Sequence, residues 1–96
     1  MKQSDFVAIF AERNNYTKHD AAIIVRDFVN TLAEVLVSGE SVSLYRFGEF
    51  EIKEYKQRRG YDVSSGETID FPAFMMPKFV PSPILKEAVK TGKLDA

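Results

Sequence analysis

The fold of this chain is decided by a short stretch that reads Phe47-Gly48-Glu49-Phe50-Glu51-Ile52. Its apolar side chains alternate with acidic ones, which predicts a strand with one apolar face and one hydrated face. Upstream, residues 41–45 show the same period of two, and residues 46–48 can turn the chain between the two runs. The sequence therefore predicts a β-hairpin over residues 41–52.

Two helices are predicted before this hairpin. Apolar residues at helical spacing run through residues 5–13, with a start at residues 3–4 and a turn at residues 14–15, where asparagine tolerates the left-handed conformation. The second helix begins after Thr17, whose hydroxyl is a suitable N-cap, and continues to Val37 before a glycine. Two helices joined by so short a connection predict a helical hairpin.

The segment after the hairpin is predicted to be a long two-stranded arm. Its apolar content drops between Tyr55 and Phe71, and a turn signal follows the basic residues of the first half. The second half is typical of a strand but contains Pro72 and Pro77, and proline within a strand indicates an edge or an unsupported ribbon. We expect an arm over about residues 53–78 with its tip at residues 63–66.

The last predicted element is a short helix. Ser82 is a suitable N-cap, Pro83 occupies the first helical position, and Gly92 ends the apolar stripe. The order of elements predicts an α+β fold in a single domain over residues 1–96. Its expected parts are a helical base (1–40), a three-stranded sheet with the arm (41–81) and a C-terminal helix (82–92).

Composition excludes several classes of protein. Thirteen Lys and Arg residues are balanced by 14 Asp and Glu residues, so any anion site must be a local patch and not a consequence of bulk positive charge. Without cysteine and with one histidine, the chain has no disulfide, thiolate or multi-histidine metal site. It has no apolar run of membrane-spanning length and no signal-peptide pattern at its start. We therefore expect a soluble, cytoplasmic protein.

Catalysis is not predicted. Glu49 and Glu51 share a strand face and could do acid–base work, but no nucleophile or phosphate-binding loop accompanies them. His19 is expected to be a solvent-exposed residue in the first turn of the second helix, without a ligand. The sequence predicts no enzyme, no cofactor, no metal and no small-molecule substrate.

A set of short motifs resembles the bacterial HU/IHF family of histone-like DNA-binding proteins. The motifs are Phe47-Gly48-x-Phe50-x-Ile52, Arg58-x-Gly60, Gly66-Glu67, Pro72-x-x-x-x-Pro77-x-Phe79-x-Pro81 and Leu85-Lys86-x-Ala88-Val89. The resemblance covers about residues 3–90. It implies an intertwined homodimer with a helical base, sheets that form a saddle, and paired arms in the DNA minor groove, as in other architectural proteins of this kind.

The resemblance also implies roles for individual residues. Those expected to bind DNA are Arg46, Lys53, Lys56, Arg58, Arg59, Tyr61, Val63, Lys78 and Lys86. Those expected in the dimer core are Phe28, Leu32, Phe47, Phe50 and Phe79. The cluster Phe71, Phe74, Met75 and Met76 is expected to pack at the arm base and dimer interface, with a protein-binding surface as the alternative.

Several positions depart from the family pattern. Val63 stands at the arm tip where relatives usually carry a proline that wedges between base pairs, and Asp62 beside it would repel phosphate. Tyr61 and Val80 replace basic residues, whereas Arg46 adds a positive charge where relatives usually have glycine. The implied DNA affinity is weaker than that of a strongly basic relative.

The sequence thus leads to one hypothesis and one alternative. The hypothesis is a nucleoid-associated homodimer that binds duplex DNA with little sequence specificity and bends or compacts it. The alternative is a structural or interaction subunit that keeps the fold, with weak or lost DNA binding, as a heterodimer partner of a related chain or with a protein-binding arm.

Overall fold

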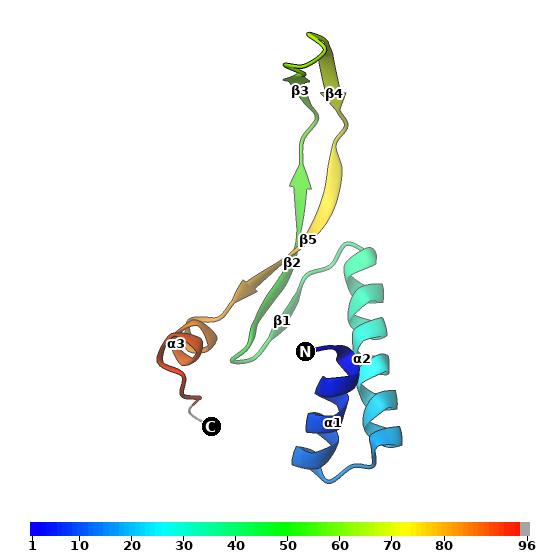
Figure 1. The fold of residues 1–96 in the computed structure, drawn as a ribbon, viewed down its shortest axis with the longest axis vertical. Helices are drawn as coiled ribbons and strands as arrows, with labels where there is room; N and C mark the ends of the chain where they lie inside the picture. The colour runs from blue at the N-terminus through cyan, green and yellow to red at the C-terminus, as the bar shows by residue number, and fades with distance from the viewer. Residues whose placement is uncertain (95–96) are drawn as a thin grey trace.

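The computed structural model describes residues 1–94, so the last two residues of the predicted domain lie outside the described part. The molecule is elongated, with principal extents of 59 × 32 × 28 Å, and a long ribbon projects from a helical base (Figure 1). The predicted α+β order is confirmed. The elements are α1 (Gln3–Asn14), α2 (Lys18–Val37), β1 (Val42–Leu44), β2 (Gly48–Tyr55), β3 (Arg58–Tyr61), β4 (Thr68–Phe71), β5 (Phe74–Pro81) and α3 (Pro83–Thr91).

Local signals fix the helical hairpin where the sequence predicted it. Helix α1 runs from Gln3 to Asn14, and its C-cap residue Asn15 adopts the left-handed conformation with φ of 59°. The Thr17 hydroxyl oxygen then accepts a hydrogen bond from the Asp20 backbone N–H at 3.1 Å and so caps helix α2. Both boundaries result from a residue type that favours the local backbone conformation or satisfies a helix-end donor.

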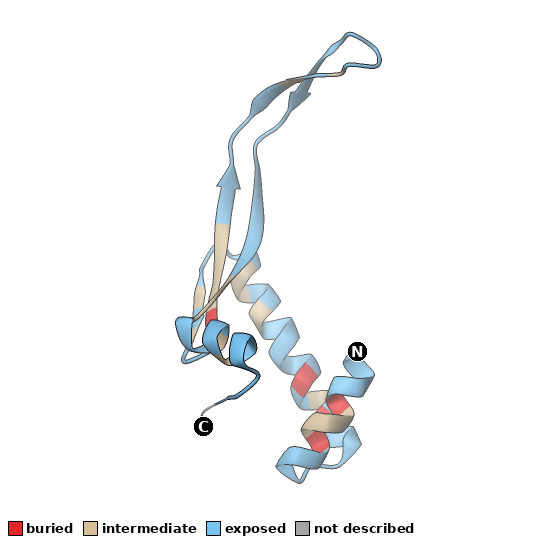
Figure 2. Ribbon diagram, turned by 60° about the vertical axis from the view of Figure 1, so that its left-hand side comes forward, coloured by how far each residue is buried: buried red, intermediate tan, exposed pale blue. Residues whose placement is uncertain are grey.

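The buried core within one chain is very small. Among residues 1–94, the buried hydrophobic side chains are Val7, Ala11, Ala21 and Val25, all between α1 and α2 (Figure 2). The predicted core aromatics are not among them. Phe28 is 53% exposed, and Phe47 and Phe79 are each more than one-third exposed. These rings were predicted for the dimer core, and in a single chain they stay partly exposed because no element of the same chain covers them.

The exposed area confirms that one copy leaves much apolar surface uncovered. The chain exposes 8195 Å². A compact monomer of 10.9 kDa exposes about 5,600 Å², so the excess is roughly 2,600 Å². The Cα radius of gyration is 19.1 Å, against about 12.5 Å for a compact chain of this length. An apolar groove of about 660 Å³ between α1 and α2 is part of this surface, and Phe6, Phe10 and Phe28 line it.

The body of the molecule carries a three-stranded antiparallel sheet in the order β1-β2-β5. Its apolar face carries a cluster of aromatic rings, with the Phe79 ring 5.3 Å from Phe47 and 4.8 Å from Phe50. Gly48 makes room for this cluster. A Cβ at that position would lie 2.6 Å from the Val80 carbonyl oxygen and 2.7 Å from the Phe79 ring. The predicted β-hairpin is confirmed, except that Tyr45 lies in the turn and not on the first strand.

The arm consists of two ladders separated by a short interruption. Strands β2 and β5 pair outward as far as Tyr55 and Phe74, and a second ladder of β3 and β4 carries the ribbon to its tip. The interruption comprises residues 56–57 on one side of the ribbon and 72–73 on the other. Because each side has the same number of unpaired residues, the pairing register is the same before and after the interruption. Pro72, which has no backbone N–H to donate, lies in this gap.

Pro77 is tolerated for a different reason. It lies in β5, where it pairs with Ile52. Strand β5 is at the edge of the sheet and has no neighbour on its outer side, so the N–H group that proline lacks is not needed to bond a further strand. The prediction that these prolines indicate an edge or an unsupported ribbon is confirmed.

Helix α3 is attached to the sheet through its N-cap. The Ser82 hydroxyl oxygen accepts a hydrogen bond from the Leu85 N–H at 3.1 Å, and the Ser82 N–H donates to the Phe47 carbonyl at 3.0 Å. The second bond places the start of α3 beside the β1–β2 turn (Figure 1). Within residues 1–94, no helix is long and apolar enough to cross a membrane.

Candidate nucleic-acid interface

The sheet presents a charged face opposite its apolar one. Side chains alternate across a strand, so Glu49, Glu51 and Lys53 lie on the opposite face from Phe50. The register places Lys78 opposite Glu51 on the same face. Two carboxylates and two ammonium groups therefore balance here, and the body of the sheet has no excess positive charge. Any attraction for a polyanion must come from elsewhere.

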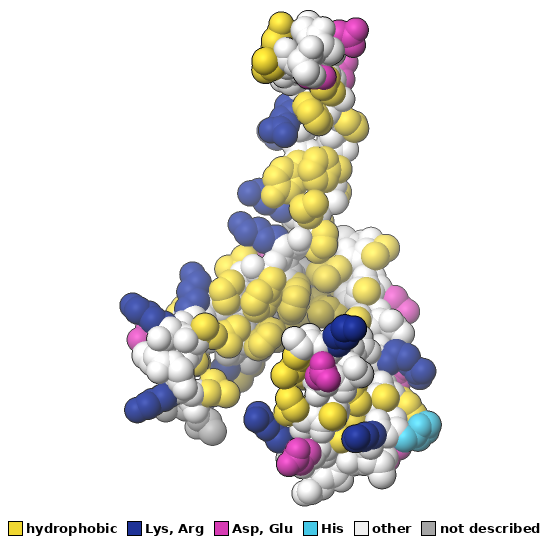
Figure 3. Space-filling model, in the orientation of Figure 1, with side chains coloured by type: hydrophobic (Ala, Val, Ile, Leu, Met, Phe, Trp, Pro, Cys, Tyr) yellow, Lys and Arg dark blue, Asp and Glu magenta, His cyan; other side chains and the backbone are white. Residues whose placement is uncertain are grey.

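The excess positive charge lies along the first strand of the arm. The expected DNA-binding residues Lys53, Lys56, Arg58 and Arg59 follow one another there, and Figure 3 shows Lys and Arg side chains along this edge of the ribbon. All four are exposed. Beyond them the sign reverses, because Asp62 and Glu67 flank the tip turn, and a third acid, Asp70, lies across the ladder from Arg59. The arm is thus positive in its lower half and acidic near its end.

Arg58 lies against an aromatic ring. Its guanidinium carbon is 5.0 Å from the centroid of the Phe71 ring, which lies directly across the ladder. The same ring covers Gly60, where an added Cβ would come within 2.6 Å of it. A cation over a ring face keeps its N–H groups available for another partner.

Arg59 lies in an ion pair. Its Nε lies 3.2 Å from the Asp70 Oδ1 oxygen, and both side chains are exposed. Neither Asp70 nor Phe71 was predicted to contact an arginine. With the tip placed at residues 63–66, the register of a simple hairpin would have paired both residues with the two arginines, so this signal was present in the sequence.

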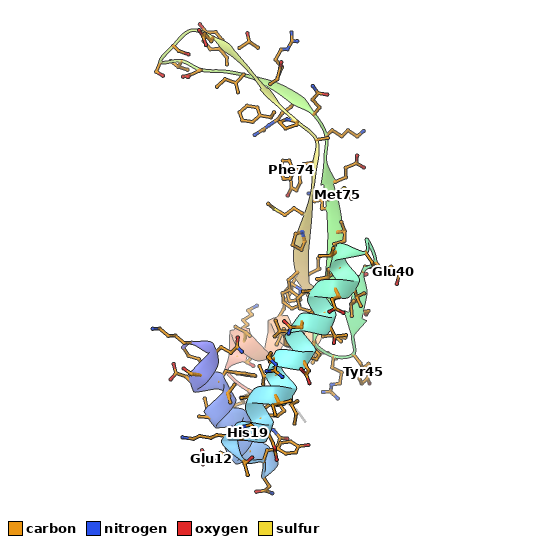
Figure 4. The ribbon with its side chains drawn as sticks, turned by 90° about the vertical axis from the view of Figure 1, so that its right-hand side faces the viewer. Glu12, His19, Glu40, Tyr45, Phe74 and Met75 are labelled. Carbon is orange, nitrogen blue, oxygen red and sulfur yellow. The ribbon has the colours of Figure 1, made fainter. Side chains whose placement is uncertain are left out.

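The arm base is apolar and aromatic. The Tyr55 and Phe74 rings are stacked with centroids 4.9 Å apart and planes 10° apart, and the Lys53 ammonium lies 5.3 Å from the Tyr55 centroid. Phe74 and Met75 lie where the ribbon leaves the body (Figure 4). Met75 is 61% exposed. Of the cluster expected to pack here, Phe74 stacks on Tyr55, which was not part of the prediction, whereas Met75 stays uncovered in one chain.

The tip is a compact turn held by Asp62. One of its carboxylate oxygens accepts hydrogen bonds from the Ser64 hydroxyl at 2.8 Å and the Ser64 N–H at 3.0 Å. The Ser64 hydroxyl, then the Ser64 N–H, and more weakly Ser65, lower the pKa of Asp62 below its ordinary value of 3.8. Val63 stands beside it, 88% exposed. The predicted tip position is confirmed, and the carboxylate has a structural partner within the turn.

The remaining predicted cations lie at the other end of the sheet. Arg46 occupies the β1–β2 turn in the left-handed conformation, with φ of 63°, and Lys86 is exposed on α3. The bond between Ser82 and Phe47 brings these two elements together. His19 is exposed on α2, far from the arm (Figure 4). The described residues hold no group of three or more His, Cys, Asp or Glu side chains suited to a metal.

A family profile described as bacterial DNA-binding protein matches residues 1–90 of this sequence. The chain belongs to this family. The resemblance to HU that the sequence motifs carried is thereby confirmed. This HU-family chain is 40% identical over 90 residues to the SPbeta prophage-derived DNA-binding protein HU 2 of Bacillus subtilis, covering 94% of this chain and 98% of that protein. It is 34% identical to the DNA-binding protein HU of Geobacillus stearothermophilus, covering 94% and 100%.

Solved structures agree with the family assignment. A cocrystal structure of Anabaena HU with DNA superposes with a TM-score of 0.85 at 31% identity, covering 93% of this chain and 97% of that one. HU from Thermotoga maritima superposes with a TM-score of 0.65 at 27% identity, covering 93% and 98%. The HU-like fold expected from the sequence is therefore confirmed across the helices, the sheet and the arm.

Proposed function

We propose that this chain is an architectural protein that binds duplex DNA with little sequence specificity and bends or compacts it. The observation that carries the proposal is the row of exposed cations on the first strand of a projecting ribbon, in a chain of the HU family. Anabaena HU, which superposes on this chain with a TM-score of 0.85, was crystallised with DNA. Proteins of this kind place such ribbons in the minor groove.

The working unit is proposed to be a homodimer. The excess exposed area of roughly 2,600 Å² for a single chain is more than the approximately 800 Å² per partner of a standard interface and suits an obligate, intertwined dimer. The residues proposed to form its core are exposed or half-buried in one copy: Phe28, Leu32, Phe47, Phe50 and Phe79.

Two groups of residues are proposed to contact DNA. The arm group lies on the ribbon and the adjoining strand: Lys53, Lys56, Arg58, Arg59, Tyr61, Val63 and Lys78. The base group is Arg46 with Lys86. We further propose that residues 1–96 act as one domain, that the protein is not an enzyme, and that it works in the cytoplasm on the nucleoid.

A salt titration of binding to a labelled linear duplex tests the proposal. Each phosphate neutralised on duplex DNA contributes about −0.9 to the slope of log K against log salt. If five cations per subunit engage, a dimer makes about ten contacts and affinity falls steeply with salt. Electrophoretic mobility with linear, nicked and four-way-junction DNA then measures the preference for bent substrates.

Charge reversal identifies the contact surface. The variant Arg58→Glu/Arg59→Glu should abolish binding while sedimentation shows an intact dimer, because both side chains are exposed and neither supports the body. Normal binding by this variant would exclude the arm as the contact surface. Absence of binding by the wild type at about 50 mM salt would instead favour the interaction-subunit alternative, since phosphate contacts are strongest at low salt.

A further inference from the structure

The two adjacent arginines of strand β3 have different partners. The Arg58 guanidinium lies over the Phe71 ring, whereas Arg59 is bonded to the Asp70 carboxylate. Because side chains alternate along a strand, the two arginines project from opposite faces of the ribbon. The sequence predicts DNA binding for both arginines. Their surroundings differ, because Asp70 offers Arg59 a negative charge and a hydrogen-bond acceptor, whereas the Phe71 ring is uncharged.

We propose that the two arginines contribute unequally to DNA binding, an inference that rests on the proposed function. Arg58 is the phosphate-binding arginine of the arm, and Phe71 is its positioning residue. Asp70 is an affinity-lowering residue that holds Arg59 in an internal ion pair. Asp70 thereby lowers the number of phosphates that each arm neutralises.

The environment of Arg58 suits a phosphate ligand. A ring face attracts the guanidinium electrostatically but accepts no in-plane hydrogen bond, so the N–H groups at the guanidinium edge stay free for a phosphate oxygen. The ring itself is held in place, since it lies over Gly60 where no side chain competes for the space. Phe71 thus restricts a long flexible side chain on an otherwise exposed ribbon, which reduces the entropy lost on binding.

The environment of Arg59 opposes a phosphate contact. The Asp70 oxygen, 3.2 Å from Nε, already accepts one of its hydrogen bonds and offsets its charge. The side chains are 77% and 64% exposed, so the pair is weak enough to open. Asp70 lies directly across the ladder from Arg59, so its negative charge stays close to any phosphate that approaches Arg59, and like charges repel.

Single substitutions separate the two arginines in the salt titration of the full-length dimer. Arg58→Gln should reduce the magnitude of the log–log slope by about 0.9 per arm, whereas Arg59→Gln should reduce it by much less. Asp70→Asn should raise affinity several-fold and increase the slope by about 0.9 per arm, because it releases Arg59. Arg59→Gln added to Asp70→Asn should remove that gain. Glu67→Gln is the matched control, since it removes an arm carboxylate that has no arginine across the ladder.

A second set of variants tests whether Phe71 acts by positioning Arg58 or only by supporting the arm. Phe71→Leu keeps apolar cover over Gly60 but removes the ring face, so it should lower affinity as Arg58→Gln does. In the Arg58→Gln background it should have no further effect, and Phe71→Tyr should retain wild-type binding. A further loss in that background would show that Phe71 only supports the arm.

Three results would overturn the inference. They are equal loss of slope in Arg58→Gln and Arg59→Gln, an Asp70→Asn variant that behaves like Glu67→Gln, and a Phe71→Leu effect that persists without Arg58. The proposed function fails separately, if the wild-type dimer binds no duplex at low salt, so the two failures are distinguishable.

Discussion

At the scale of single residues, Arg46 has a backbone conformation that is unfavourable for a residue with a side chain. Arg46 holds a left-handed conformation with φ of 63°, which costs a residue with a Cβ roughly 1 kcal/mol or more. The family resemblance places glycine at this position in relatives, and glycine adopts this conformation without that cost. The positive charge in the β1–β2 turn is therefore obtained at the expense of backbone strain.

This strain predicts a stability difference between two truncations. Arg46→Gly and Arg46→Ala both remove the side chain, but only the glycine relieves the Cβ clash. We expect the glycine variant to be more stable than the alanine variant by about 1 kcal/mol in urea unfolding. Equal stabilities would show that the turn relaxes around either residue.

The tip carboxylate predicts a pH dependence. Because the pKa of Asp62 in the folded arm is lowered below 3.8 by Ser64, the turn is favoured above that pH and loses this support as pH falls through the folded value. Ser64→Ala removes the hydroxyl donor and should raise the pKa of Asp62 toward 3.8, as followed by NMR titration of its carboxyl carbon. Ser65→Ala should give a smaller rise, and an unchanged pKa in Ser64→Ala would contradict the assigned cause.

At the scale of elements, side-chain contacts on both sides of a gap hold the two strands of the arm together. A two-stranded ribbon is marginal in water, and this one is interrupted at Pro72. It is held by the Tyr55–Phe74 stack below the gap and by the Arg58–Phe71 and Arg59–Asp70 pairs above it. The gap therefore separates two short, internally braced ladders, and we expect the arm to bend there.

The exposed Val63 at the tip allows a test of whether the arm inserts an apolar side chain into DNA. Val63 is 88% exposed, and burying a valine stabilises by about 1.5 kcal/mol or more, or roughly tenfold in affinity. Val63→Asp should therefore weaken binding at least about tenfold and reduce bending, measured by energy transfer between the ends of a labelled duplex. Ser65→Asp, which adds the same charge without removing the apolar group, should have the smaller effect. Equal effects of both variants would mean that only charge matters at the tip.

At the scale of the whole molecule, the uncovered apolar surface dominates. The four buried hydrophobic residues within the described range 1–94 are too few to support a chain of this size, since burial of apolar area is the main favourable term in folding. The groove lined by Phe6, Phe10 and Phe28 and the rings around Phe79 must be covered by a second copy for the fold to be stable. Folding and association are thus expected to be one process.

A coupled process predicts that stability depends on concentration. The midpoint of thermal unfolding should rise with protein concentration, and sedimentation should give a mass of twice 10.9 kDa. Phe28→Asp should shift the protein to unfolded monomer, because it places a charge in the surface that the second copy covers. Tyr45→Asp, at a fully exposed turn residue, is the matched control and should remain dimeric. A stable, folded Phe28→Asp monomer would contradict this view.

The sequence by itself determined the features that depend on neighbouring residues. The helix caps at Thr17 and Ser82, the alternation in β2 and the turn at residues 63–66 were all predicted correctly, because each reflects a local backbone preference or a nearby hydrogen bond. The HU-like fold followed from motifs of the same local kind.

Only the tertiary structure decided which contacts the arm side chains make. The register of a simple hairpin already places Asp70 across from Arg59 and Phe71 across from Arg58, but the ion pair, the ring contact and the gap at Pro72 depend on the conformation that side chains and backbone adopt. The aromatic residues predicted for the dimer core are uncovered in one chain, and periodicity by itself shows which face is apolar but not which chain buries it.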